Sequence, residues 1–153
     1  FTNTSDVIAH ACNWAEKAGL DADLVCCLYA TAPFVRSSDL VEAYRIISSQ
    51  EWQYVFSVSE YSSPIFRSFQ QTESKGVRMF FPECFDSRSQ DLPQAFYDSG
   101  MFYMGTSNAW QQGLKIFDEH SFPFKIPSWR VQDIDTPDDW ARAEKMAQYI
   151  LEV

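Results

Sequence analysis

Two aspartates near the end of the chain have the residue type and spacing of a divalent-cation site. Asp133 and Asp135 are separated only by Ile134, so in an extended segment both carboxylates point to the same face. Mg²⁺ prefers oxygen ligands and often takes one or two protein carboxylates, with substrate phosphates and water completing its shell. The pair therefore predicts a magnesium site, with chance, helix capping and solubility as the alternative origin of so short a pattern.

The residues after the pair have the composition of a helix start. Thr136 can cap the helix, and Pro137 suits its first position. Asp138 and Asp139 favour the positive end of the helix dipole, and apolar residues then recur at helical spacing through residues 138–151. We therefore expect the acidic pair where a strand ends and a helix begins, which is where open α/β sheets bind ligands.

Periodicity upstream predicts the alternating helices and strands of an α/β domain. Apolar positions at helical spacing predict a helix at residues 6–17. The unbroken apolar run 24–29 predicts a strand buried on both faces, and residues 54–58 predict a second strand. A helix at residues 37–48 between them would complete a parallel crossover, which should be right-handed.

The middle of the chain predicts an antiparallel element. Apolar residues at 65–69 and 77–81 flank a polar stretch, which favours a hairpin, and a further strand is expected at 101–104. The phenylalanines of the hairpin exceed what so small an element buries internally, so residues 60–98 are expected to carry a homodimer contact. The alternative is that these rings fill the core of the monomer.

Composition limits the class of protein. The 153 residues are 46% hydrophobic and 16% aromatic, which indicates a single folded domain at residues 1–153. The 21 acidic and 12 basic residues give a formal charge of -9, which argues against nucleic acid polymers and anionic membranes as partners. No apolar run approaches the ~20 residues of a membrane span. The four cysteines lack metal-ligand spacing, and reduced thiols suit a cytoplasmic location.

Four separated segments carry short motifs: residues 28–33 (Leu-Tyr-Ala-Thr-Ala-Pro), 88–93, 98–103 and 131–137. In this order and spacing they resemble the acylneuraminate cytidylyltransferases, or CMP-sialic acid synthetases, and within that family the pseudaminic acid cytidylyltransferases. The resemblance implies an α/β, Rossmann-like three-layer nucleotidyltransferase fold of the nucleotide-diphospho-sugar transferase type, with a mixed sheet. It also implies transfer of CMP from CTP to a nine-carbon acidic sugar, with Mg²⁺ and release of pyrophosphate.

The resemblance assigns roles to charged residues of these motifs. It makes Asp133 and Asp135 the catalytic metal ligands, and a carboxylate-bound Mg²⁺ suits attack on the α-phosphorus of CTP. Arg88 is expected to pair with the sugar carboxylate or a phosphate through its two-pronged guanidinium. The alternative for Arg88 is an ordinary surface arginine beside Asp86 and Asp91.

Neutral and aromatic residues complete the expected substrate site. Gln90 and Gln94 are amides suited to sugar hydroxyls, and Tyr103 corresponds to an aromatic residue at the sugar pocket. The resemblance implies further substrate contacts from Thr2, Thr4, Tyr29, Thr31 and Asp98. Related proteins usually have His-Asp-Ala-Gly where this chain has Tyr-Asp-Ser-Gly at 97–100, so the preferred sugar, pseudaminic or sialic, stays open.

The resemblance covers roughly the C-terminal two-thirds of a family member. The segment Phe-Thr-Asn-Thr at 1–4 aligns with an internal part of the family, and nothing here matches the Gly-Ser-Lys-Arg loop that grips the triphosphate. We therefore expect the N-terminal nucleotide-binding part to be missing. The chain by itself should bind CTP weakly or not at all, and this fragment alone is expected to be of low activity or inactive.

Two other functions remain open at this point. A metal-dependent glycosyltransferase also uses Asp-x-Asp on an α/β fold, but there the pair lies mid-domain, whereas here it precedes the last expected helix. A non-catalytic sugar-binding or dimerisation module is the second. A Gly-Ser-Lys-Arg loop encoded upstream of Phe1 would favour the enzyme, and a start codon at that point would favour the module.

Overall fold

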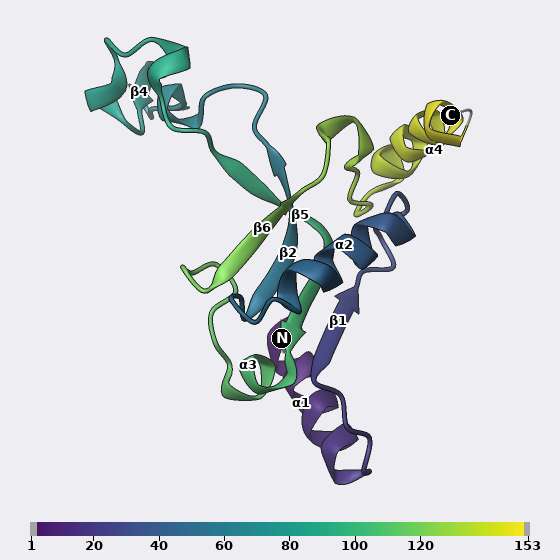
Figure 1. Cartoon of the computed structure of the whole chain (residues 1–153). Coiled ribbons are helices and arrows are strands. Elements are labelled where there is room, and N and C mark those ends of the chain that lie inside the picture. The colour runs from purple at the N-terminus through teal and green to yellow at the C-terminus, as the bar shows by residue number, and fades with distance from the viewer. Residues whose placement is uncertain (1–2, 152–153) are drawn as a thin grey trace.

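A four-stranded sheet forms the centre of the computed structural model, which describes residues 3–151 and the side chains of residues 3–150 (Figure 1). The strand order is β1 (Leu24–Leu28), β5 (Phe96–Thr106), β2 (Tyr54–Glu60) and β6 (Ser121–Lys125). β5 is antiparallel to both of its neighbours, whereas β2 and β6 are parallel. The sheet is therefore mixed, as expected.

Helices cover both faces of this sheet. α1 (Thr4–Lys17) and α3 (Ser107–Gln112) bury apolar side chains against one face. α2 (Ser37–Ile47) and α4 (Pro137–Leu151) bury theirs against the other. The three-layer α/β arrangement confirms the predicted fold class. Among the described helices, none has both the length and the apolar character needed to cross a bilayer.

β1 differs from the strand that its sequence predicted. It is an edge strand, and Cys26 and Leu28 are exposed, so the prediction of burial on both faces is wrong. β1 and β2 run in the same direction, but β5 lies between them and pairs with both. The predicted parallel neighbours are therefore separated by a strand from much later in the chain, which local periodicity does not reveal.

β5 is 11 residues long, whereas only residues 101–104 were predicted. Its first half contains the polar residues 98–99 followed by Gly100, a composition typical of a turn. Gly100 has a φ of 63°, and the pairing register of β2 with β5 shifts between Phe56 and Val58. The strand therefore bulges at Gly100, and such irregularities re-aim the neighbouring side chains.

A small lobe extends away from one end of the sheet (Figure 1). It contains the antiparallel strands β3 (Phe69–Gln71) and β4 (Val77–Met79), so the predicted hairpin is confirmed with shorter strands. The apolar run before β3 forms a 3₁₀ turn, Ile65–Arg67, rather than a strand. β2 leads into the lobe, and β5 returns from it.

The aromatic rings of the lobe are divided between packed and exposed positions. Phe66 packs on Phe81 with 5.1 Å between ring centroids, whereas Phe69 and Phe80 are 61% and 56% exposed. The chain exposes 10755 Å² in total, roughly a third more than the ~8,000 Å² expected for a compact monomer of 17.7 kDa. The monomer therefore buries only part of the lobe's aromatic surface.

Candidate substrate and metal site

The acidic pair lies in an irregular segment between the 3₁₀ turn Ser128–Arg130 and α4. Residues 131–135 form no strand, so the prediction that the pair ends a strand is wrong. Exposure still alternates along the segment: Gln132 is buried and Ile134 half-buried, while Asp133 and Asp135 are exposed. Both carboxylates therefore face solvent, and no ion pair within the described residues involves either of them.

The start of α4 has the predicted capping pattern. Thr136 Oγ1 accepts a hydrogen bond from the Asp139 N–H at 3.2 Å, and Asp139 Oδ2 accepts one from the Thr136 N–H at 3.0 Å. The hydrogen bond from the Thr136 hydroxyl lowers the pKa of Asp139 below its ordinary value, which keeps the carboxylate ionised at the helix N-terminus. These contacts fix the C-terminal end of the irregular segment 131–135, which we call the acidic loop.

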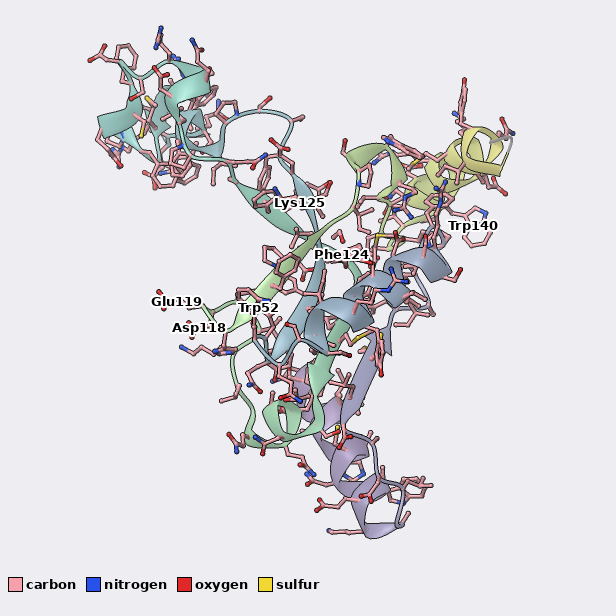
Figure 2. All side chains as sticks on the ribbon, in the orientation of Figure 1. Trp52, Asp118, Glu119, Phe124, Lys125 and Trp140 are labelled. Atoms are coloured by element: carbon pink, nitrogen blue, oxygen red, sulfur yellow. The ribbon has the colours of Figure 1, made fainter. Side chains whose placement is uncertain are left out.

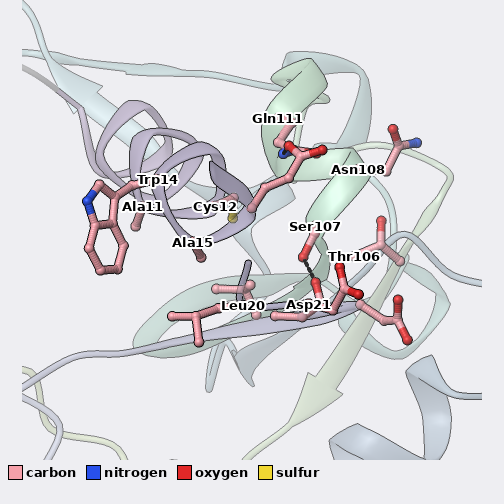
Figure 3. A pocket seen from close by; sticks show the side chains of 14 residues that line it. Ala11, Cys12, Trp14, Ala15, Leu20, Asp21, Thr106, Ser107, Asn108 and Gln111 are labelled. Carbon is pink, nitrogen blue, oxygen red and sulfur yellow. Dashed lines mark hydrogen bonds between the residues drawn. The ribbon is translucent and has the colours of Figure 1, made fainter. Parts of the chain in front are cut away.

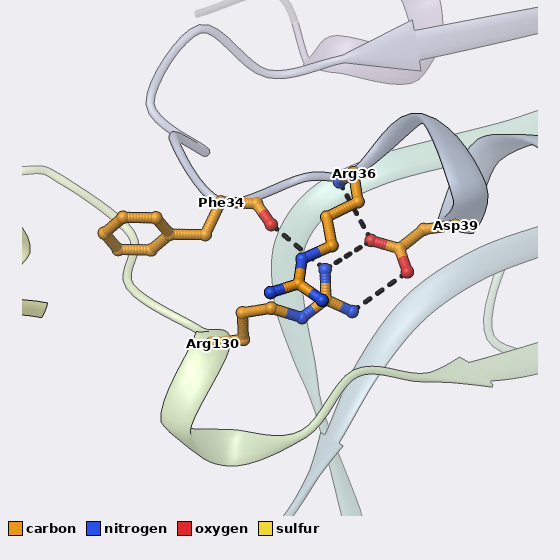
Figure 4. Close-up of polar contacts among 4 residues, drawn as sticks. All are labelled: Phe34, Arg36, Asp39 and Arg130. Carbon is orange, nitrogen blue, oxygen red and sulfur yellow. Dashed lines mark hydrogen bonds and ion pairs between the residues drawn. The ribbon is translucent and has the colours of Figure 1, made fainter. Parts of the chain in front are cut away.

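A buried ion pair fixes the N-terminal end of the acidic loop (Figure 4). Arg130 Nη1 and Nη2 donate to the Asp39 carboxylate at 2.6 and 2.9 Å, and Nη1 also donates to the Phe34 carbonyl at 3.2 Å. Burial alone would raise the pKa of Asp39, but hydrogen bonds from Arg130 and from the Arg36 backbone N–H outweigh it and lower that pKa. Its partners are 91 residues apart in the chain, so no local sequence pattern predicts this pair.

Asp133 lies against the bulge of β5. A Cβ atom added at Gly100 would lie 3.3 Å from Asp133 Oδ2, at a φ that already disfavours other residues. The N–H of Gly100 donates to Asp98 Oδ1 at 3.0 Å. Gly100 thus lies between the acidic loop and Asp98, and it brings two segments of the expected site together.

Other predicted substrate residues surround a cavity of about 170 Å³ beneath the start of α1, lined in part by Thr4, Tyr29 and Tyr103. The Tyr29 hydroxyl donates to Thr4 Oγ1 at 2.9 Å, and the two tyrosine rings meet edge to face at 5.6 Å. The Tyr103 hydroxyl donates to Asp98. Burial, reinforced by Asp98, raises the pKa of Tyr103, so its phenol remains a donor. These four residues form one connected cluster.

The predicted residues on the lobe side are not joined to this cluster. Arg88 donates to both Asp91 oxygens at 2.7 and 3.2 Å, which is the pairing expected of a surface arginine, so its substrate contact stays a prediction. Gln90 and Gln94 line a shallow cavity beside Glu60, where the lobe joins the sheet. Their amides are therefore accessible to a ligand at that junction.

The acidic pair suits Mg²⁺ rather than a closed metal cage. Within residues 3–150, no group of three or more His, Cys, Asp and Glu side chains converges. Asp133 Oδ1 accepts a hydrogen bond from the Ile134 N–H at 3.0 Å. Two exposed carboxylates fit a cation that keeps water and phosphate oxygens in its shell, so Asp133 and Asp135 would hold it. Thr31 lies half-buried in the turn after β1, and Thr2 lies outside the described residues.

A separate cavity of about 530 Å³ lies between α1, α3 and the start of β1 (Figure 3). Trp14 and Leu20 contribute exposed apolar surface to it, and Gln111 Nε2 donates to Glu16 Oε2 at 2.8 Å beside it. None of the predicted site residues among those that the structure describes lines this cavity. It lies at the opposite end of β1 from Tyr29, so it is not part of the candidate site.

Comparison with known proteins finds several cytidylyltransferases among the relatives of this chain. Two pseudaminic acid cytidylyltransferases of Campylobacter jejuni, from serotypes O:2 and O:23/36, are 38% and 44% identical over 139 residues, or 91% of this chain. The N-acylneuraminate cytidylyltransferase B of Danio rerio is 30% identical over 126 residues, covering 82% of this chain and 30% of that protein. The chain spans 60% of the length of the two Campylobacter relatives. No family model matches the chain.

A solved structure supports the fold independently. The CMP:2-keto-3-deoxy-manno-octonic acid synthetase, solved in complex with CTP, matches 99% of this chain and 70% of that chain with a TM-score of 0.60. At 10% identity this likeness concerns the fold alone, and it confirms the nucleotidyltransferase architecture. The sequence similarity, which extends over nine-tenths of this chain, makes it similar to the pseudaminic acid cytidylyltransferases and, more distantly, to the N-acylneuraminate cytidylyltransferases.

Proposed function

We propose that this chain carries the metal-binding and sugar-binding residues of a cytidylyltransferase. The reaction transfers CMP from CTP to a nine-carbon acidic sugar of the pseudaminic or sialic acid type and releases pyrophosphate. The observation that carries the proposal is the approach of Asp133 to Gly100, because it joins a metal ligand to the cluster of Asp98 and Tyr103. The names of the Campylobacter relatives support the reaction class.

The chain's own residues would orient the sugar. Asp98 accepts hydrogen bonds from the Gly100 N–H and the Tyr103 hydroxyl, and its carboxylate has further lone pairs for a sugar hydroxyl or amide N–H. Tyr29 and Thr4 present hydroxyls beside the cavity of about 170 Å³ beneath the start of α1. Bound Mg²⁺ would neutralise the charge of the reacting phosphate and hold the departing pyrophosphate. Positioning of this kind supplies much of the catalysis in phosphoryl transfer.

The exposed face of the lobe supports a homodimer as part of the proposal. Phe69 and Val77 are each more than half exposed, and the pairing of β3 with β4 places both on the same face of the hairpin. Contiguous exposed apolar side chains commonly mark an interface between proteins. The four free thiols favour a reducing compartment, and we propose the cytoplasm.

Pyrophosphate release with CTP, Mg²⁺ and pseudaminic acid tests the reaction directly. Because the chain spans 60% of its Campylobacter relatives, the assay should include a chimera in which this chain replaces the matched region of the serotype O:23/36 enzyme. We expect the chimera to turn over, and Asp135→Asn to lower its rate at least about a hundredfold, since even outer-shell partners of a metal contribute 10- to 100-fold.

Asp138→Asn is the matched control for this assay. Asp138 is exposed in the first turn of α4, three residues beyond Asp135, and should tolerate the same loss of charge. A chimera that is folded but inactive would argue for the non-catalytic module. Full activity in the Asp135→Asn chimera would remove the metal pair from the mechanism. The glycosyltransferase alternative predicts sugar transfer from a nucleotide sugar, with no release of pyrophosphate from CTP.

A further inference from the structure

Lys125 ends β6 with a positive charge that forms no ion pair with an acid among the described residues. Figure 2 labels Lys125. The ammonium of this residue lies 4.6 Å from the centroid of the Phe96 ring, in cation–π contact, and the residue is exposed. None of the ion pairs formed within the described residues involves it. The Phe96 ring covers part of the lysine without engaging its hydrogen-bond donors, which remain available to an anion.

Strand pairing places Lys125 in the same row as Asp98. Val58 of β2 pairs with Asp98 of β5 on one side and with Lys125 of β6 on the other. Paired residues point to the same face of a sheet, and Val58 belongs to the buried cluster that contains Tyr103. Lys125 and Asp98 therefore flank Val58 on the face that carries the tyrosine cluster, about 10 Å apart between their backbones from the spacing of two strands.

A cation is needed on this face because the proposed sugar is an anion. The polar groups of the cluster are the neutral hydroxyls of Thr4, Tyr29 and Tyr103 and the carboxylate of Asp98. Glu60 adds a second exposed acid two residues beyond Val58. The chain as a whole carries a formal charge of -9. Arg88, to which the family resemblance assigns this role, is already paired with Asp91. An acidic ligand would be repelled here without a local positive charge.

We infer that Lys125 binds the carboxylate of the nonulosonic acid through a charge-assisted hydrogen bond. Asp98, on the other side of Val58, then accepts from a hydroxyl or amide N–H of the same sugar. The contact with Phe96 keeps the lysine ammonium close to this row, so less side-chain freedom is lost on binding. The inference rests on the proposed function, because it assumes that an acidic sugar is the ligand.

A cycle of two ligands and two proteins tests it. The ligands are pseudaminic acid and its methyl ester, which lacks the negative charge, and both are titrated in the presence of CTP and Mg²⁺. The proteins are the chain as given and its Lys125→Met variant. Lys17→Met, an exposed lysine in the last turn of α1, is the control for net charge. The ratio of the two dissociation constants isolates the carboxylate contact from any general loss of structure.

We expect the unaltered chain to prefer the acid over the ester by about tenfold or more, as for a hydrogen bond between charged groups. This preference should fall to about one in Lys125→Met, persist in Lys17→Met and be largely retained in Lys125→Arg. An unchanged preference in Lys125→Met would overturn the inference while leaving the proposed function intact. Binding of neither ligand by the unaltered chain would overturn the sugar-binding proposal and this inference with it.

Discussion

Replacing Arg130 by methionine should destabilise the fold strongly, because it leaves the Asp39 carboxylate buried without its charged partner. The two side chains are only 6% and 10% exposed, and Arg130 donates to both carboxylate oxygens and to the Phe34 carbonyl. Removing one member of a buried ion pair typically costs 3–5 kcal/mol, so we expect a loss of about 4 kcal/mol at neutral pH. That is a large part of the stability of an ordinary domain.

The contribution of Asp39 to stability should depend on pH in opposite directions in the unaltered chain and in Arg130→Met. In the unaltered chain, the lowered pKa of Asp39 stabilises the folded state. This stabilisation is fully present above the pKa of Asp39 in the unfolded state, about 3.9, and is lost as the pH falls through its pKa in the folded state. In Arg130→Met, burial acts on the carboxyl without the guanidinium and should raise its pKa above the unfolded value. The folded variant then holds its proton more tightly, so its stability should rise as pH falls from 7 towards 4.

Urea unfolding followed by tryptophan fluorescence at pH 7 and pH 5 measures both effects. Arg45→Met is the matched control, because Arg45 forms an exposed ion pair with Glu42 and should cost less than about 1 kcal/mol. Arg130→Met combined with Asp39→Leu should recover much of the loss, since the unpaired charge is removed as well. Equal costs for the two arginine variants at pH 7, or the same pH slope in both, would refute the reasoning.

Four further expectations follow from the fold and the site. Gly100→Ala should destabilise the fold by about 1–2 kcal/mol because Gly100 has a left-handed φ, and it should also displace Asp133 and so weaken the Mg²⁺ binding measured by calorimetry. Gly19→Ala, where φ is 72° and the surrounding space is open, should show the backbone strain alone. Phe69→Ser should lower the dimer fraction in sedimentation, and a chain that is monomeric at high concentration before the change would contradict the interface. Burial raises the pKa of Tyr54 to about 12, so stability should be complete below pH 10 and decline as pH rises from about 10 to about 12, a decline that should be absent in Tyr54→Phe. The chain by itself should show no tight CTP binding in calorimetry with Mg²⁺, and tight binding would reveal a nucleotide site among the residues present.

The parts of the fold set by neighbouring residues were predictable from sequence. The start of α4 followed from Thr136 and Asp139, which bond to each other across three residues. The helical spacing of apolar residues likewise predicted α1 and α2 to within a few residues at each end. In such elements the stabilising contacts are local, so the pattern that causes the structure is visible in a short window.

The parts set by distant residues were not predictable in this way. β5 begins with a composition typical of a turn because its bulge needs Gly100 with a positive φ, and its partners β1 and β2 lie far upstream. The row formed by Asp98, Val58 and Lys125 exists only because three strands align in one register. The resemblance predicted all four residues of the cluster formed by Thr4, Tyr29, Asp98 and Tyr103. It gave no sign of Lys125 or of the Arg130–Asp39 pair.

The free edge of β1 makes strand pairing between copies a hazard for the purified chain. Within the described residues, β1 pairs along one side only, and it has neither a proline nor a lysine to block the other side. Two copies that met along this edge would bring Cys26 of each close to its counterpart, so oxidation in air could lock the contact as a disulfide. Handling the protein under thiol reductant should therefore suppress an aggregation route that is chemically distinct from association through the lobe.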